Sequence, residues 1–204
     1  MDGGTNPRST RSKRSVWKSI PVVAVALLIA FALVLTLLYS LETTFRERHV
    51  SYEYAVIIEP DASGQFTLVC SLPANYDGMA YPNVLSSMTV DGDVTISKVT
   101  TPYGDGLEVV GTGPTIITWS HNFTYRTSTQ NIHDHYSNLT MLDIGYTRGN
   151  AYVYIEGPGA NFSLSYHYDH VYGNVGADFL SYAVTGDLVA GWNTLSVDYD
   201  QAVA

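Results

Sequence analysis

One uninterrupted apolar stretch lies near the start of the chain. From Ser19 to Leu41 no residue carries a charge, and most are Val, Ala, Leu or Ile. At the helical rise this stretch spans about 34 Å, which is enough to cross a hydrocarbon layer of about 30 Å. Because lipid offers no partners to free backbone amides, the pattern predicts a single transmembrane helix over residues 19–41.

Three residues near the ends of this span are candidates for membrane anchoring. Pro21 is expected in the first turn of the helix, where its missing N–H breaks no helical bond. Trp17 and Tyr39 fall near the two ends, where aromatic rings favour the membrane interface. The apolar run is longer than the core of about 7–15 residues in a cleaved signal peptide, and no Ala-x-Ala sequence follows it. This favours an uncleaved signal anchor.

Beyond Tyr52 the apolar positions alternate with a period of two. Alternate residues are apolar in Tyr52–Ile58 and in Phe66–Leu72, and the segment Pro60–Gly64 between them has turn-forming residues. This pattern predicts a β-hairpin with Cys70 as a buried thiol on its apolar face. Similar short runs recur along the chain, separated by Gly-, Asn- and Asp-rich segments: Val94–Val99, Gly106–Val110, Thr115–Trp119, Asn122–Arg126, Leu139–Tyr146, Ala151–Glu156, Asn161–Tyr168, Phe179–Val184 and Trp192–Tyr199.

Eight to eleven short strands at this spacing are typical of a sandwich or barrel. We therefore predict an all-β extracellular domain over residues 52–204, a β-sandwich of Ig-like or jelly-roll-like order, on the single N-terminal helix. Residues 73–87 lack a period and are predicted as a loop, and 176–184 has a short helix as its alternative. Residues 1–18 are predicted to be a disordered basic tail, and residues 42–51 a short stem.

The last apolar run carries a weak family resemblance. Its Gly191-x-Asn193-x-Leu195-x-Val197 pattern resembles the closing strand of many extracellular sandwich modules. In those modules the pattern leads the chain into an edge strand. The resemblance implies architecture only.

The distribution of charge predicts the orientation in the membrane. The chain of 204 residues has a net charge of −9. Before the span, five basic residues face a single acid, a net charge of +4, whereas residues 42–204 hold eighteen acids and five bases, a net charge of −13. Basic flanks stay cytoplasmic, so the N-terminus is expected inside the cell membrane and the C-terminal domain outside. An acidic body of this kind also speaks against a nucleic-acid partner.

Glycosylation and metal binding are the two candidate chemistries of the exterior. Three acceptor sequons occur, at Asn122, Asn138 and Asn161. Five of the six histidines lie between residues 121 and 170. His133 and His135 share one face if they lie on a strand, and His167, Asp169 and His170 follow further on, so that these residues are candidate ligands of a divalent metal. The alternative is that they are polar residues of loops and of the wet faces of strands.

No pattern in the sequence identifies an enzyme. Ser86–Asp93 looks like the nucleophile box of type I signal peptidases, but it lacks the Pro of that box, and Gly92-Asp93 arrives too early. A Ser nucleophile also needs a base within reach, and neither Lys98 nor a His lies in a recognisable partner motif. The fifteen tyrosines outside the predicted span suit strands and cross-strand pairs, with a carbohydrate- or protein-binding platform as the alternative. We assign no catalytic residue and no cofactor.

The order of a basic leader, an apolar helix and a sequon-bearing β exterior resembles that of archaeal type IV pilins and archaellins. That resemblance implies cleavage before the helix, at Lys18–Ser19, and assembly into a filament. The chain lacks the early acidic residue and the small-residue start of that family. We therefore predict a single-pass envelope protein that displays a non-catalytic binding or structural module. Its predicted partners are the bilayer and other envelope proteins or glycans. The alternatives are a pilin-like filament subunit and a metal-binding enzyme or sensor.

Overall fold

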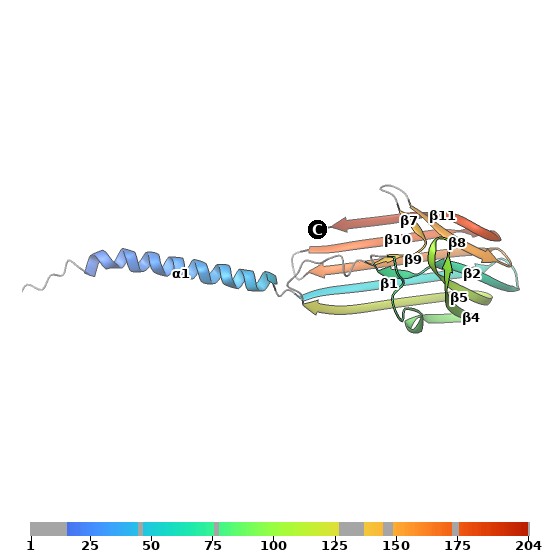
Figure 1. The fold of residues 1–204 in the computed structure, drawn as a ribbon, viewed down its shortest axis with the longest axis horizontal. Coiled ribbons are helices and arrows are strands. Elements are labelled where there is room, and N and C mark those ends of the chain that lie inside the picture. The colour runs from blue at the N-terminus through green and yellow to red at the C-terminus, as the bar shows by residue number, and fades with distance from the viewer. Residues whose placement is uncertain are drawn as a thin grey trace, which may run out of the picture. The chain divides into compact units, whose positions relative to one another are not determined.

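The computed structural model describes residues 16–44, 47–75, 78–126, 137–144, 149–172 and 176–203. The chain forms two compact units, residues 1–45 and 46–204 (Figure 1). The first holds one apolar helix and the second is built mainly of strands, which confirms the prediction of a β-rich body after an N-terminal apolar helix. The basic tail predicted over residues 1–18 lies largely outside the described residues.

Helix α1 runs over Val16–Thr44 and contains the whole predicted span. Its segment Val23–Ser40 has a mean hydropathy of 2.6, and none of it is buried within the protein. By length and composition this segment can cross a membrane. Because the helix begins at Val16, Pro21 lies inside it and not in its first turn as expected. Tyr39 is well exposed near the other end.

The predicted stem of residues 42–51 is divided between two elements. Helix α1 continues to Thr44, and strand β1 already begins at Glu47. Residues 48–51 belong to this strand because their backbones pair with neighbouring strands on both sides.

The β unit contains eleven strands and one 3-10 turn among the described residues. They are β1 (Glu47–Pro60), β2 (Gln65–Ser71), β3 (Pro73–Asn75), η1 (Leu85–Ser87), β4 (Thr89–Thr101), β5 (Gly104–Arg126), β6 (Ser137–Leu139), β7 (Leu142–Ile144), β8 (Gly149–Glu156), β9 (Ala160–Tyr172), β10 (Gly176–Leu188) and β11 (Gly191–Val203). The segment for which a short helix was the alternative is therefore strand, in β10. The predicted loop over 73–87 contains β3 and η1.

The strand pairings close into a ring. From β1 the hydrogen-bonded neighbours lead through β9, β10, β11, β8, β2 and β5 back to β1, and all of these pairs are antiparallel. Figure 1 shows the long strands β10, β9, β1 and β5 side by side. Strand β4 pairs with the outer edge of β5, and β7 with β8.

Two strands change partner halfway along their length and so join the ring. Residues 106–112 of β5 pair with β2, whereas residues 115–126 pair with β1. Residues 191–197 of β11 pair with β8, and residues 197–203 with β10. Strand β11, which the closing pattern predicts as an edge strand, has one paired neighbour along each half of its length. Asn193 instead fixes the preceding turn, because its amide exchanges hydrogen bonds with both backbone groups of Val189 at 2.8 and 3.1 Å.

The predicted hairpin of β1 and β2 is wrong. The two strands do not pair with each other; both run antiparallel to β5 and follow one another along it. The turn between them is tied elsewhere, since the Asp61 amide donates to the carbonyl of Gly159 at 2.8 Å. The segment between the two strands is irregular, as its residues indicate, but it carries the chain past a bend in β5 without reversing it.

The interior of the ring follows the period-two pattern. Even-numbered residues are buried from Val50 to Ile58 of β1 and from Ala160 to His170 of β9, and their odd-numbered neighbours face outward. Cys70 is fully buried, as predicted, beside the Tyr54 hydroxyl at 3.9 Å, and that hydroxyl donates to the Ser71 carbonyl at 2.7 Å. Burial raises the pKa of the Cys70 thiol to about 12. The thiol is therefore neutral and unreactive in the folded protein.

Candidate ligand pocket

A run of aromatic side chains lines the inward face of β5 near one end of the ring. Trp119, His121 and Phe123 alternate with the outward-facing Ser120 and Asn122, so the three rings lie side by side on one face of the strand. Their ring centres are 6.1 Å and 5.5 Å apart. They form one wall of a pocket.

Tyr52 of β1 completes this wall. It is the register partner of His121, and its ring centre lies 5.9 Å from that of Trp119 and 6.0 Å from that of Phe123. Burial and the neighbouring Tyr81 hold the pKa of Tyr52 well above its ordinary value, so its hydroxyl remains protonated. The rings of Tyr52, Trp119 and His121 are nearly parallel, with planes 13° to 27° apart.

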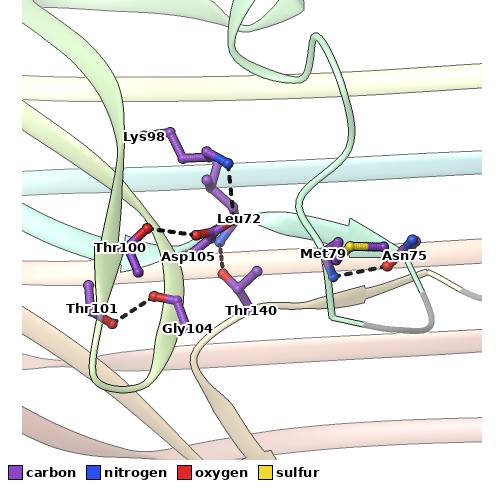
Figure 2. Close-up of polar contacts among 9 residues, drawn as sticks. All are labelled: Leu72, Asn75, Met79, Lys98, Thr100, Thr101, Gly104, Asp105 and Thr140. Carbon is purple, nitrogen blue, oxygen red and sulfur yellow. Dashed lines mark hydrogen bonds and ion pairs between the residues drawn. The ribbon is translucent and has the colours of Figure 1, made fainter.

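The segment between β3 and β4 forms the opposite wall. Tyr81 brings its ring centre within 5.9 Å of both Tyr52 and Trp119. The segment is fixed by backbone hydrogen bonds, among them the Tyr81 amide to the Pro73 carbonyl at 3.2 Å. A side-chain bond fixes it further, from the Met79 amide to the Asn75 Oδ1 at 2.9 Å (Figure 2). This wall is held in place without a ligand.

A direct contact joins the two walls. The Trp119 indole N–H donates to the Ser87 Oγ at 3.0 Å, and that hydroxyl lies within reach of the carbonyls of Asn83 and Val84 at 3.1 and 3.0 Å. The polar edge of Trp119 is thereby satisfied within the protein. The ring of Trp119 is almost inaccessible, whereas His121 on the same wall is exposed and Phe123 is half-buried.

The cavity between the walls has a volume of about 370 Å³. This falls at the lower end of the range of about 300–1,000 Å³ that is usual for small-molecule sites. Among the lining residues, Tyr52, Trp119 and Val84 are almost inaccessible to solvent. Asn83, Ser86 and His121 are exposed and lie at the mouth of the cavity. The described lining contains no Asp, Glu, Lys or Arg; its members are Tyr52, Tyr81, Pro82, Asn83, Val84, Ser86, Ser87, Trp119, His121 and Phe123. We call this cavity the aromatic pocket.

The candidate metal ligands are only partly brought together. His167 and Asp169 share the outward face of β9, and the imidazole Nε2 lies 3.0 Å from the Asp169 Oδ2. His170 lies on the opposite face and is fully buried, beside the buried Asp178 that is its register partner on β10. Residues at positions 167 and 170 of one strand point to opposite faces, so these two imidazoles do not converge.

His133 and His135 lie outside the described residues. Within the described part of the chain, no group of three or more His, Cys, Asp and Glu side chains is arranged to hold a metal ion. His167 instead lines an open depression of about 450 Å³ on the outward face, where Glu53 of β1 is its register partner. Serine and threonine side chains make up much of the rest of that lining.

The three sequon asparagines have different surroundings. Asn122 and Asn161 are exposed on strands, and the Asn161 amide donates to Asp187 at 3.0 Å. Asn138 is half-buried, and its Oδ1 accepts hydrogen bonds from the Tyr182 hydroxyl at 3.1 Å and from the Leu139 amide at 2.8 Å. Glycosylation of these residues stays a prediction, with Asn122 and Asn161 better placed for it than Asn138.

Ser87, the serine of the Ser-Met pair in the segment that looks like a signal-peptidase box, accepts a hydrogen bond from Trp119 and donates toward the carbonyls of Asn83 and Val84. Ser86 and Lys98 line one hollow nearby. Ser86 donates to the Asn83 carbonyl at 2.9 Å. The Lys98 ammonium lies 3.1 Å from the Asp105 Oδ2, as Figure 2 shows, and that contact holds the pKa of Asp105 below its ordinary value. Each group is thus engaged by another partner. This geometry does not support a serine nucleophile with a lysine base.

A second aromatic gathering lies on the exterior of β8 and β11. Tyr103, in the β4–β5 turn, stacks on Tyr152 at 4.0 Å and meets Trp192 edge-on at 4.9 Å, while Tyr154 lies 5.4 Å from Trp192. Tyr103 and Trp192 remain 42% and 43% exposed. We call these four residues the surface aromatic cluster. Their rings pack against each other on the exterior of the unit.

The sequence pattern indicates one wall of the aromatic pocket but not the other. The alternation of Trp119, His121 and Phe123 marks one strand face, but dividing β5 into separate strands at residues 119 and 122 concealed it. Tyr81 lies in a segment without a period, so no pattern could place it opposite that face. Its position depends on long-range hydrogen bonds such as the one to Pro73.

Comparison of this chain with protein-family models, with curated proteins and with solved structures finds no match. The class that the observations define is a β-rich domain with a closed ring of strand pairings and an aromatic pocket, in a chain that also has one apolar helix of membrane-spanning length.

Proposed function

We propose that the chain is a single-pass cell-surface protein whose apolar helix anchors it in the membrane and whose β unit is a non-catalytic binding module. The observation that carries the proposal is the contrast in burial. Helix segment Val23–Ser40 is wholly exposed, whereas the β unit buries its own apolar side chains. Exposed apolar surface on this scale is stable in lipid and not in water.

The charge asymmetry supports the orientation with the β unit outside. Five bases and one acid lie before the apolar span of residues 19–41, and the part after it is strongly acidic. Basic segments near a span are retained in the cytoplasm. The same acidity, with sequons at exposed asparagines, is compatible with an envelope environment and disfavours nucleic acid as a partner.

A two-layered, sandwich-like form of the β unit is part of this proposal. It is supported by the partner changes in β5 and β11, because a strand that pairs with one sheet in its first half and with another in its second half joins two layers at a corner. The closed ring departs from both Ig-like and jelly-roll-like pairing.

Protease treatment of intact cells tests the orientation. With an epitope tag at each end of the full chain, external protease is expected to remove the C-terminal tag and leave the N-terminal tag protected, and washing with alkaline carbonate is expected to leave the chain in the membrane. Protection of the C-terminal tag, or release by carbonate, contradicts the proposal. Sequencing of the mature N-terminus separates the filament alternative, which requires a chain that begins at Ser19.

A further inference from the structure

The aromatic pocket allows the class of ligand to be inferred, on the basis of the proposed binding function. We propose that it binds a single uncharged sugar ring, a pyranose, with the C–H face of the ring against the aromatic wall and its hydroxyls at the mouth. The argument rests on the shape of the wall, the absence of charge, the polar groups at the mouth and the volume.

The aromatic wall presents rings in similar orientations. The planes of Tyr52, Trp119 and His121 differ by 13° to 27°. Sites for quaternary ammonium groups surround the cation with several ring faces and use cation–π attraction. The rings of Tyr52, Trp119 and His121 stack on one another and do not enclose a cation in this way. His121 and Phe123, the more accessible members of the wall, leave aromatic surface for the weakly positive C–H groups of a sugar.

The charge of the lining points the same way. No carboxylate, ammonium or guanidinium group is among the described lining residues. Burial of a charged ligand group without a partner is costly, so the lining selects against phosphates, carboxylates and amines. An uncharged ligand remains.

The polar groups at the mouth disfavour a purely apolar ligand. Asn83, Ser86 and His121 are exposed, and they place an amide, a hydroxyl oxygen and an imidazole beside the aromatic wall. Such groups can both donate and accept, as neighbouring hydroxyls of a sugar require. Asn83 is held with φ at +68°, a left-handed conformation that is uncommon outside glycine. Backbone strain of this kind often occurs at binding sites.

The volume limits the size of the ligand. A cavity of about 370 Å³ accommodates one sugar ring, but not an extended chain of several rings. A ligand of this size reaches a dissociation constant of about 1 mM at ordinary ligand efficiency. The pocket is therefore expected to recognise one residue, either free or at the end of a glycan.

Tryptophan fluorescence provides the test, because Trp119 is part of the wall. The full chain is placed in lipid nanodiscs free of sugar-based detergent and carries Trp192→Phe, so that Trp119 is the sole tryptophan of the β unit. The probes are the methyl glycosides of glucose, galactose, mannose and N-acetylglucosamine, with choline as a cationic comparison. At least one glycoside is expected to give a saturating change in emission with a dissociation constant of about 1 mM.

Two variants test the mouth of the pocket, and one serves as a matched control. His121→Ala and Asn83→Gly are each expected to weaken binding about threefold to tenfold, because each removes a hydrogen-bonding group. Glycine keeps the left-handed backbone at position 83 accessible. His49→Ala removes another exposed histidine, which bonds Thr124 and is not in the lining, and is expected to change nothing.

Several outcomes overturn the inference. They are saturation by choline alone, equal losses in His121→Ala and His49→Ala, and no saturation by any glycoside up to about 100 mM. The protease experiment uses no sugar. If the chain binds no sugar but its β unit is cleaved by external protease, only the sugar inference fails and the proposed display function stands. If the chain binds sugar while its β unit is protected from protease, only the display function fails.

Discussion

The same residue types occupy opposite surroundings in the two units of this chain. Phe31 of α1 is 62% exposed, whereas Phe162 of β9 is fully buried. Throughout Val23–Ser40 no residue is buried within the protein, while Val56, Leu68 and Ile117 of the β unit are inaccessible. The β unit provides its own apolar interior. The helix has no such interior, so its exposed apolar surface requires lipid as its solvent.

The largest expected effect follows from placing charge in the helix. Leu28→Arg together with Leu33→Arg introduces two guanidinium groups near the middle of the span, at a cost to membrane insertion of about 5–7 kcal/mol. We expect the full chain to shift from the carbonate-resistant fraction to the soluble or degraded fraction.

The matched control is Leu28→Ala with Leu33→Ala, which shortens the same side chains without charge and is expected to remain membrane-bound. Equal retention of the two double variants shows that the helix does not need a lipid environment. That result would contradict the difference in surroundings between the helix, in lipid, and the β unit, in water.

Replacing Phe162 and Phe31 in turn tests whether the interior of the β unit is stable independently of the helix. Phe162→Ala leaves a cavity in the ring interior and is expected to lower the free energy of unfolding of the β unit by about 3–5 kcal/mol. Phe31→Ala removes the same side chain from the helix and is expected to leave that free energy unchanged. Denaturant unfolding followed by tryptophan fluorescence in nanodiscs measures both. A comparable loss in Phe31→Ala contradicts the independence of the two units.

The bend shared by β4 and β5 gives an intermediate effect. At Gly92, where the register of β4 shifts, a Cβ would lie 2.7 Å from the Thr115 Oγ1, and φ is +141°. Gly92→Ala is expected to cost about 2–4 kcal/mol through strain and crowding. Gly64→Ala has a similar φ of +152° with nothing within 4 Å, so it isolates the strain alone and is expected to cost about 1–2 kcal/mol. Equal losses contradict close packing at the bend.

These glycines also show how far the sequence could predict the fold. Period-two patterns located the strands, and the Gly- and Asp-rich segment Tyr103–Gly106 lies at a reversal of the chain, because Thr101 pairs with Gly104 across residues 102 and 103. Asp91–Asp93 and Gly111–Pro114 have similar composition but lie within continuous strands, as a bulge and a bend. Glycine permits either structure, and the choice depends on which strands pair over long range.

The candidate site shows the same division between local and long-range information. Alternation is local, so it explains why His167 and Asp169 share a face and why His170 does not join them. The aromatic pocket needs Tyr81 opposite Trp119, two residues 38 positions apart. Nothing in either segment by itself indicates the other. Their contact is a consequence of the ring and of hydrogen bonds that fix the segment after β3.

The smallest expected effect concerns the buried thiol of Cys70. It tests whether the interior of the β unit disfavours a charged group, as the lipid around the helix is expected to do. Burial raises the pKa of Cys70 to about 12, above its value in an unfolded chain, so the protonated thiol stabilises the fold. That stabilisation is complete below the unfolded pKa of about 8.5 and is lost as the pH rises toward 12. Cys70→Ala should therefore change the free energy of unfolding less at pH 10 than at pH 8, with a difference of about 1–2 kcal/mol. Because burial also raises the pKa of Tyr54, some loss of stability at alkaline pH is expected in both proteins, and only the difference between them reports on the thiol. A difference that is independent of pH, or rapid alkylation of Cys70 in the native protein at pH 8, contradicts a closed interior around this residue.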